Sequence, residues 1–66
     1  MPYVNIRITD ENVTADEKRG LIIGTTKLLE TVLGKDPKTT FVVIDEVSTD
    51  NWGVAGKQVT DLRKNV

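Results

Sequence analysis

The chain contains no cysteine and no histidine, and Ser48 is its only serine. The missing cysteines exclude disulfides and thiolate metal ligands, and the missing histidines exclude the commonest nitrogen ligand for zinc. The same absences exclude a Ser–His or Cys–His nucleophile. The bases that remain are carboxylates, lysines, the single tyrosine and the N-terminal amine.

The chain is also short, at 66 residues, and we interpret residues 1–66 as one domain. A chain of this length buries only about 60% of its unfolded surface, and one core rarely supplies more than ~3–5 kcal/mol. Small proteins usually compensate with disulfides, metals or oligomerisation. With no cysteine and no histidine, self-association is the route that we expect.

The chain also has no large excess of either charge, since it contains nine basic and ten acidic residues and its net charge is −1. Nucleic-acid binding proteins normally carry clustered basic charge, so we expect no nucleic-acid partner. No apolar run approaches the ~18 residues of a membrane span, and no signal-peptide core follows Met1. We therefore expect no membrane association and a cytoplasmic location.

Two segments have the composition of β-strands. In residues 3–8, YVNIRI, apolar and polar side chains alternate, which is typical of a half-buried strand. Residues 40–47, TFVVIDEV, have a continuous apolar run, which is typical of a strand buried on both faces. The consecutive Asp45 and Glu46 must then point to opposite faces, so they do not form a paired carboxylate site.

Residues 15–33 have apolar side chains at helical spacing and clear signals at both ends. Thr14 and Glu17 predict a capping box at the N-terminus. Gly34 is the expected left-handed residue after the last turn, and Pro37 follows it.

The C-terminal third has shorter signals. Residues 54–59, VAGKQV, predict a short hairpin, with Gly53 and Gly56 allowing its tight geometry. Residues 60–66, TDLRKNV, have Leu62 as their one large apolar side chain, and we expect them to fray.

Together these elements predict an α+β fold: a β–α–β unit with parallel strands and one long helix, followed by a C-terminal β-hairpin. One helix cannot cover both faces of a sheet. The uncovered face and edges must therefore meet another copy of the chain, so we expect the fold to be assembled into an oligomer.

Pro2 directly follows the initiator methionine. It can be read simply as a proline at the first residue of a strand, where proline is tolerated. Alternatively, removal of Met1 leaves a free secondary amine. An α-amino group titrates near ~8, and burial or a nearby cation lowers that pKa toward the range in which a general base is most effective.

The chain resembles the tautomerase superfamily, and within it the 4-oxalocrotonate tautomerase (2-hydroxymuconate tautomerase) family. The resemblance rests on PYVNIRI at 2–8, DEKRGLI at 16–22, the stretch 37–39, VVIDEV at 42–47 and NWGVAGK at 51–57. It implies a homohexamer built as a trimer of dimers, with active sites at subunit contacts. It also implies Pro2 as general base, Trp52 as an aromatic wall, and no metal or organic cofactor.

One departure from the family concerns charge. Family members that act on dicarboxylates carry an arginine in the loop after strand one and another early in strand two. Here these stretches read ENVT and TFVVI and contain no arginine or lysine. The resemblance thus implies an unsaturated 2-keto acid as substrate, and the missing arginines favour a monoanionic one.

Other residues are candidates to bind the substrate carboxylate: Arg7, Asn5 and Arg63, with Lys38 and Lys57 as further cations. Each has a structural alternative. Arg7 fits a surface or intersubunit ion pair with Asp10 or Glu46, Asn5 fits a hydrogen bond to another chain, and Trp52 fits an interface anchor.

Two other functions stay open at this stage. A non-catalytic assembly protein would keep the fold without the chemistry. A hydratase or dehalogenase would use a protonated Pro2 as an acid, and it would need a water-activating carboxylate beside the amine.

Overall fold

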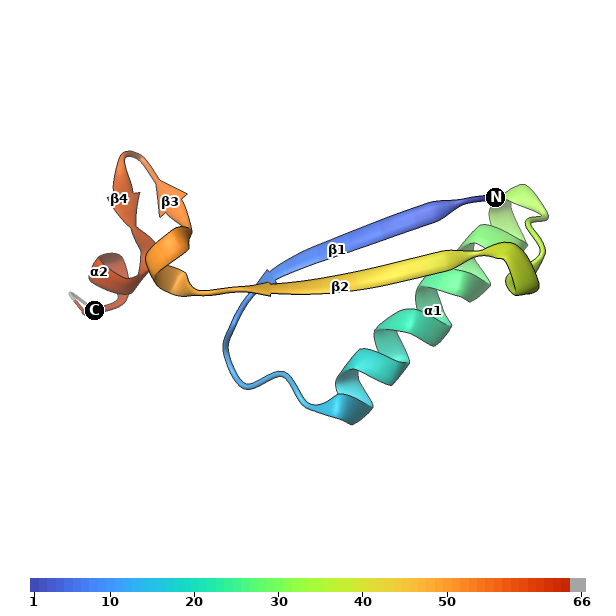
Figure 1. The fold of residues 1–66 in the computed structure, drawn as a ribbon, viewed down its shortest axis with the longest axis horizontal. Coiled ribbons are helices and arrows are strands. Elements are labelled where there is room, and N and C mark those ends of the chain that lie inside the picture. Colours follow the sequence, from blue (N-terminus) through green and yellow to red (C-terminus); the bar gives the residue numbers. More distant parts are fainter. Residues whose placement is uncertain (65–66) are drawn as a thin grey trace.

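The computed structural model describes residues 1–64. Its strands and helices follow the chain in the order β1 (Tyr3–Thr9), α1 (Ala15–Leu33), β2 (Phe41–Val47), β3 (Gly53–Val54), β4 (Lys57–Gln58) and α2 (Val59–Lys64). Two short 3-10 turns, Pro37–Thr39 and Thr49–Asn51, come before and after β2. The fold is α+β, as predicted (Figure 1).

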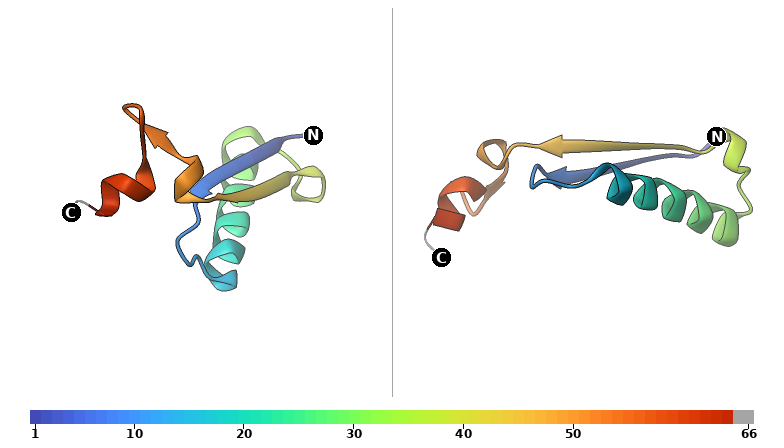
Figure 2. Two further views of the ribbon diagram at one scale, coloured as in Figure 1. Left: turned by 60° about the vertical axis from the view of Figure 1, so that its left-hand side comes forward. Right: turned by 90° about the horizontal axis from the view of Figure 1, so that it is seen from below.

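Strands β1 and β2 lie side by side and are parallel, in a register that pairs Tyr3 with Phe41 and Thr9 with Val47. Helix α1 connects them and lies along one face of this two-stranded sheet (Figure 2). The predicted β–α–β unit is confirmed. The second strand starts at Phe41, one residue later than predicted, because Thr40 ends the preceding 3-10 turn.

Helix α1 begins and ends where its capping residues predict. The Thr14 hydroxyl oxygen accepts a hydrogen bond from the Glu17 N–H at 3.1 Å, and the Glu17 carboxylate accepts one from the Thr14 N–H at 2.9 Å. Gly34 adopts a left-handed conformation (φ 67°), and its N–H donates to the Glu30 carbonyl at 2.9 Å. The caps satisfy backbone groups that the helix itself leaves unpaired.

The two faces of the sheet differ in how they are covered. Val4, Ile6 and Ile8 alternate with exposed residues and are half-buried, and Ile8 lines a depression together with Leu21 of α1, so they lie on the face that α1 covers. An ion pair between Lys18 of α1 and Glu46 of β2 crosses to the same face. Asp45, the neighbour of Glu46, lies on the open face, so the two carboxylates point to opposite sides as predicted.

Much apolar surface is left uncovered, and none of residues 1–64 is fully buried. On the open face of the sheet, Tyr3 is 64% exposed, Phe41 50% and Val43 41%. Exposed apolar side chains on α1 are Leu21, Ile22, Ile23, Leu28, Val32 and Leu33. A single copy of the chain therefore has no closed hydrophobic core.

The dimensions of the chain lead to the same conclusion. Its radius of gyration is 15.2 Å, whereas a compact chain of this length has about 11 Å. Its accessible surface is 5056 Å², and a folded monomer of 7.3 kDa exposes about 4,200 Å². The excess of roughly 900 Å² is close to the ~800 Å² that each partner contributes to a standard protein interface.

The segment after β2 projects away from the β–α–β unit (Figure 1). Strands β3 and β4 form the predicted antiparallel hairpin. Its two-residue turn has Ala55 (φ 54°) and Gly56 (φ 77°), both left-handed, as a type I′ turn requires. Gly56 thus has the role that the sequence predicts.

The prediction for the C-terminus was wrong, because Val59–Lys64 form helix α2. The Val59 N–H donates to the Trp52 carbonyl at 2.8 Å, and this bond positions the start of the helix. Residues 65–66 of the stretch predicted to fray lie outside the described residues. No helix within residues 1–64 is both long enough and apolar enough to cross a membrane.

Candidate functional site

Pro2 lies at the beginning of β1, where it is half-buried. Its carbonyl accepts a hydrogen bond from the Phe41 N–H at 3.0 Å, which ties the residue directly before β1 to the first residue of β2. Met1, which precedes it, is 85% exposed. Removal of Met1 would therefore leave the sheet intact and would place a secondary amine at the edge of a fixed strand.

A polar cluster lies on the open face of the sheet and consists of Asn5, Arg7 and Asp45. The Asn5 amide donates to the Asp45 carboxylate at 2.8 Å and to the Val43 carbonyl at 3.1 Å. The Arg7 Nε donates to the Asn5 amide oxygen at 3.3 Å and lies 3.7 Å from the Asp45 carboxylate. The sequence suggested a surface or intersubunit ion pair of Arg7 with Asp10 or Glu46. Within one chain Arg7 pairs instead with Asp45, which faces it in the register.

Trp52 lies in the segment between β2 and β3, at the end of the second 3-10 turn, and it is half-buried. Its carbonyl is bonded to Val59, the first residue of α2. Close by, the Gln58 amide donates to the Asp50 carbonyl at 2.8 Å. These bonds make Trp52 and α2 parts of one C-terminal unit.

Arg63, on α2, forms an ion pair with Glu11 of the loop that follows β1. The other oxygen of the Glu11 carboxylate accepts a hydrogen bond from the Thr9 hydroxyl. The Arg63 side chain is still 55% exposed and that of Glu11 38%. The pair links the C-terminal unit to the β–α–β unit.

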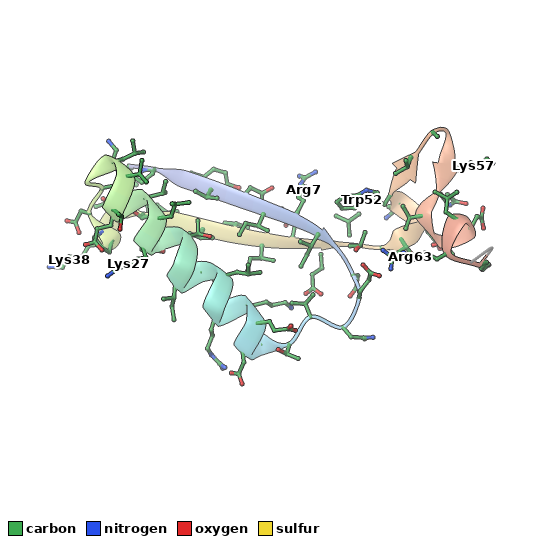
Figure 3. The ribbon with its side chains drawn as sticks, turned by 180° about the vertical axis from the view of Figure 1, so that it is seen from behind. Arg7, Lys27, Lys38, Trp52, Lys57 and Arg63 are labelled. Atoms are coloured by element: carbon green, nitrogen blue, oxygen red, sulfur yellow. The ribbon has the colours of Figure 1, made fainter. Side chains whose placement is uncertain are left out.

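The predicted site residues do not come together within one copy of the chain. Pro2 lies at the amino end of the parallel strands, whereas Trp52 and Arg63 lie beyond their carboxyl end (Figures 1 and 3). A seven-residue strand separates the two ends by about 23 Å at ~3.3 Å per residue. Among the further cations, Lys38 lies at the Pro2 end and Lys57 on the hairpin.

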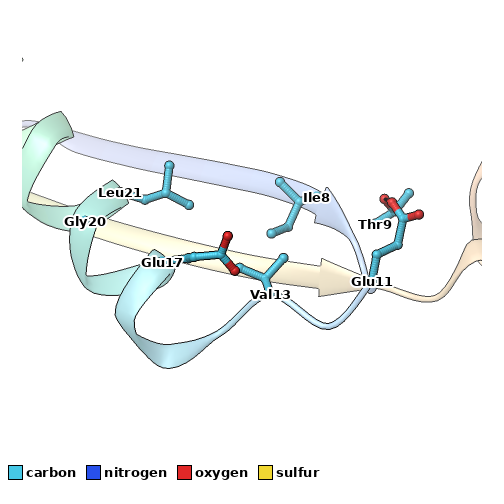
Figure 4. A pocket seen from close by; sticks show the side chains of 7 residues that line it. All are labelled: Ile8, Thr9, Glu11, Val13, Glu17, Gly20 and Leu21. Atoms are coloured by element: carbon cyan, nitrogen blue, oxygen red, sulfur yellow. Dashed lines mark hydrogen bonds between the residues drawn. The ribbon is translucent and has the colours of Figure 1, made fainter.

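An open depression of about 580 Å³ lies between the end of β1, the loop after it and the first turns of α1 (Figure 4). Its apolar lining comes from Ile8, Val13 and Leu21. Its acidic residues already have partners, because Glu17 belongs to the helix cap and Glu11 to the Arg63 pair. Pro2 does not line the depression, so it is not the predicted catalytic pocket.

Within residues 1–64, no three or more acidic side chains lie together in a way that could hold a metal ion.

The fold and the comparisons with known proteins define the class: the chain belongs to the tautomerase family. The family described as "Tautomerase enzyme" matches residues 2–62. "Probable tautomerase K2" of Dickeya dadantii is 59% identical over 97% of this chain and 96% of its own. "2-hydroxymuconate tautomerase" of Bacillus subtilis is 32% identical over 94% and 98%. The family that the sequence resembles is thus confirmed.

Solved structures agree with the family match. The crystal structure of DmpI from Helicobacter pylori is similar to this chain with a TM-score of 0.89 and 38% identity. The similarity covers 96% of this chain and 97% of that one. The two structures therefore share their fold over nearly the whole length of both chains.

Analysis of the sequence missed one residue of the candidate site, Glu11. The loop sequence ENVT lacks a cation, and no pattern in it singles out its acidic residue. The Glu11–Arg63 pair joins opposite ends of the chain, and it depends on α2, which the sequence did not predict. The absence of a cation from ENVT was the one signal that pointed to this loop.

Proposed function

We propose that the protein is an isomerase that moves a proton between the enol and keto forms of an unsaturated 2-keto acid, with Pro2 as the general base. Family membership supports a tautomerase-like activity. The observation that carries the proposal is the position of Pro2, at the start of a fixed strand and preceded by one exposed residue. Removal of Met1 is part of the proposal.

The chemistry follows from the nitrogen of proline. In a peptide bond this nitrogen has no basicity, but as a free secondary amine it can accept a proton from the enol hydroxyl and return one to carbon. The ring fixes the amine relative to the strand, which favours a defined geometry for proton transfer. The proton taken up and the proton returned balance, so no oxidant, metal or cofactor enters the reaction.

Self-association is the second part of the proposal. Pro2 lies at one end of the sheet and Trp52 and Arg63 lie at the other, so a complete site needs residues from two copies of the chain. The uncovered apolar side chains and the excess surface support such an assembly. The resemblance to the 4-oxalocrotonate tautomerase family implies a homohexamer, and we propose that state.

The third part concerns the substrate carboxylate, which we assign to the guanidinium groups of Arg7 and Arg63. Asn5, predicted to bind the substrate, instead donates both amide hydrogens to Asp45 and the Val43 carbonyl and accepts from Arg7, so we assign it the role of positioning Arg7. Arg7 uses its Nε within the polar cluster. A guanidinium has five donors in a fork that matches a carboxylate, so the outer donors of Arg7 can still bind an anion. Trp52 would form a flat wall that excludes water.

The test uses two samples of defined mass, one starting at Pro2 and one retaining Met1, of equal assembly size. Ketonisation of 2-hydroxypenta-2,4-dienoate is followed by ultraviolet absorbance. Blocking the amine removes a general base, and we expect the rate to fall by about 10²–10⁴-fold. The Pro2→Ala variant keeps a primary amine but loses the ring, so we expect an intermediate loss.

Two results would contradict the proposal. If the sample with Met1 is as fast as the processed chain, the nitrogen of Pro2 is not the base. If the rate of the processed chain falls as pH rises, a protonated amine acts as an acid, as in a hydratase. The proposal requires the rate to rise with pH through a single ionisation and then level off.

A further inference from the structure

Glu11 and Arg63 form an ion pair between the loop after β1 and helix α2. One oxygen of the Glu11 carboxylate faces the Arg63 Nη1, and the other is held by the Thr9 hydroxyl. The pair brings a loop of the β–α–β unit onto the last helix. The two oxygens of the Glu11 carboxylate thus have different partners, Arg63 and Thr9.

The same pair lies where a ligand can reach it. Arg63 is 55% exposed and Glu11 38%, so neither group is enclosed by the chain. Trp52, the proposed wall of the site, belongs to the same C-terminal unit as Arg63 (Figure 3). Arg63 is thus an accessible guanidinium in the segment that also carries Trp52, and its carboxylate partner is already in place.

We propose that Glu11 is a specificity-determining residue: its carboxylate occupies the Arg63 guanidinium and thereby disfavours substrates that carry a second carboxylate. This inference rests on the proposed function, since it concerns the anion that the tautomerase site accepts. A monocarboxylate needs one cation, which Arg7 can supply. A dicarboxylate needs a second one, and at Arg63 it must either displace Glu11 or lie beside a like charge.

Both routes are unfavourable. Displacement exchanges one guanidinium–carboxylate pair for another and also breaks the bond from Thr9, so it gains little. Placing two carboxylates side by side is repulsive, and such repulsion is a general way to reject a competing ligand. Because the pair is partly exposed, we expect a selectivity of about fivefold and not of several orders of magnitude.

The experiment compares two ligands of equal length, adipate with two carboxylates and hexanoate with one. Trp52 is the only tryptophan, so its fluorescence follows the binding of either acid without any turnover. Dissociation constants are measured for the processed chain, for Glu11→Gln and for the double variant Glu11→Gln/Arg63→Ala. The matched control is Asp10→Asn, which removes the same charge from the neighbouring position, an exposed side chain.

We expect Glu11→Gln to improve adipate binding relative to hexanoate about fivefold, and the double variant to lose that gain. We expect Asp10→Asn to change the ratio by less than about twofold, since Asp10 does not pair with Arg63. The ratio of kcat/KM for a dicarboxylate over a monocarboxylate 2-hydroxydienoate should shift in the same direction.

The inference is overturned if Glu11→Gln leaves the ratio unchanged, whatever it does to the melting temperature, because the pair is then only a structural link. An equal change in Asp10→Asn would mean a general field effect and would also overturn it. So would a chain that binds neither acid, since Arg63 then forms no carboxylate site. Because binding is read without catalysis, a failure of the Pro2 base is detected separately, by the rates.

Discussion

The β–α–β unit, residues 3–47, and the C-terminal segment, residues 48–64, are stabilised in different ways. The first consists of two seven-residue strands and a 19-residue helix, which are stabilised by regular backbone hydrogen bonds. The second has two-residue strands and a six-residue helix. Its shape depends on side chains: the Thr60 hydroxyl donates to the Asp50 carboxylate at 2.5 Å, and the Thr49 hydroxyl lies 2.5 Å from that of Thr60.

This difference matters for function, because the proposed base belongs to the first region and the proposed wall and cation belong to the second. A regular strand can fix Pro2 through a single backbone bond to Phe41. Trp52 and Arg63 do not lie next to a long strand pair, and they are positioned by local hydrogen bonds and by the Glu11–Arg63 ion pair. We therefore expect substitutions in the two regions to affect different properties.

The largest effect is expected from Val43→Asp, on the open face of the sheet. Val43 is 41% exposed in the single chain, and the proposed assembly covers it. A charge buried without a partner there would prevent association. Light scattering should then give a mass near that of one chain, and circular dichroism should show loss of the α1 signal.

The control for this substitution is Asn12→Asp, which adds the same charge at an exposed left-handed residue. An assembled Val43→Asp protein would contradict the proposed interface.

A smaller effect, confined to the C-terminal segment, is expected from Thr60→Val. The substitution removes the hydrogen bonds to Asp50 and Thr49 and leaves the Asp50 carboxylate without this donor. Losses of this kind amount to about 1–2 kcal/mol. Hydrogen exchange at the Val59 amide, which is bonded to Trp52, should accelerate about tenfold, while exchange in β1 and β2 stays unchanged.

The matched control for Thr60→Val is Thr26→Val in α1, where the hydroxyl bonds only the Ile22 carbonyl of its own helix. That variant should leave the Val59 amide unaffected. If both variants accelerate exchange equally at Val59, the two regions open as one cooperative unit, and the distinction between them is wrong.

The smallest effect is expected from Thr14→Ala, at the cap of α1. It removes the hydroxyl that accepts from the Glu17 N–H, and such losses amount to about 1 kcal/mol. The melting temperature, measured at fixed chain concentration, should fall by roughly 4–8 °C for a domain of this size. Thr14→Ser keeps the acceptor and should retain most of the stability. Equal losses in both variants would mean that packing of the threonine methyl, and not the cap, stabilises this end.

The sequence predicts the β–α–β unit well because its signals are redundant. Helix α1 has apolar spacing, a capping box and a glycine stop, and each indicates the same boundaries. Helix α2 has none of these signals. It forms because the Val59 N–H meets the Trp52 carbonyl and the Thr60 hydroxyl meets Asp50. Contacts of this kind are made by the tertiary structure, so periodicity could not reveal them.

For the candidate site, the sequence predicts where Pro2 lies but not which side chains Arg7 and Arg63 contact. The position of Pro2 at the start of a strand follows from the sequence, since its neighbours alternate in polarity. The partner of Arg7 could not be predicted, because it depends on the parallel register that places Asp45 opposite. The engagement of Arg63 by Glu11 depends on the path of the chain after β2.

The turn of the hairpin could be made more stable by one substitution, at Ala55. Ala55 has a left-handed backbone, which costs an L-residue with a β-carbon about 1–2 kcal/mol, whereas asparagine tolerates this conformation. With Gly56 beside it, an asparagine would complete the Asn-Gly pair preferred in such turns. Ala55→Asn should therefore stabilise the C-terminal segment, which contains Trp52, without altering any side chain of the proposed site.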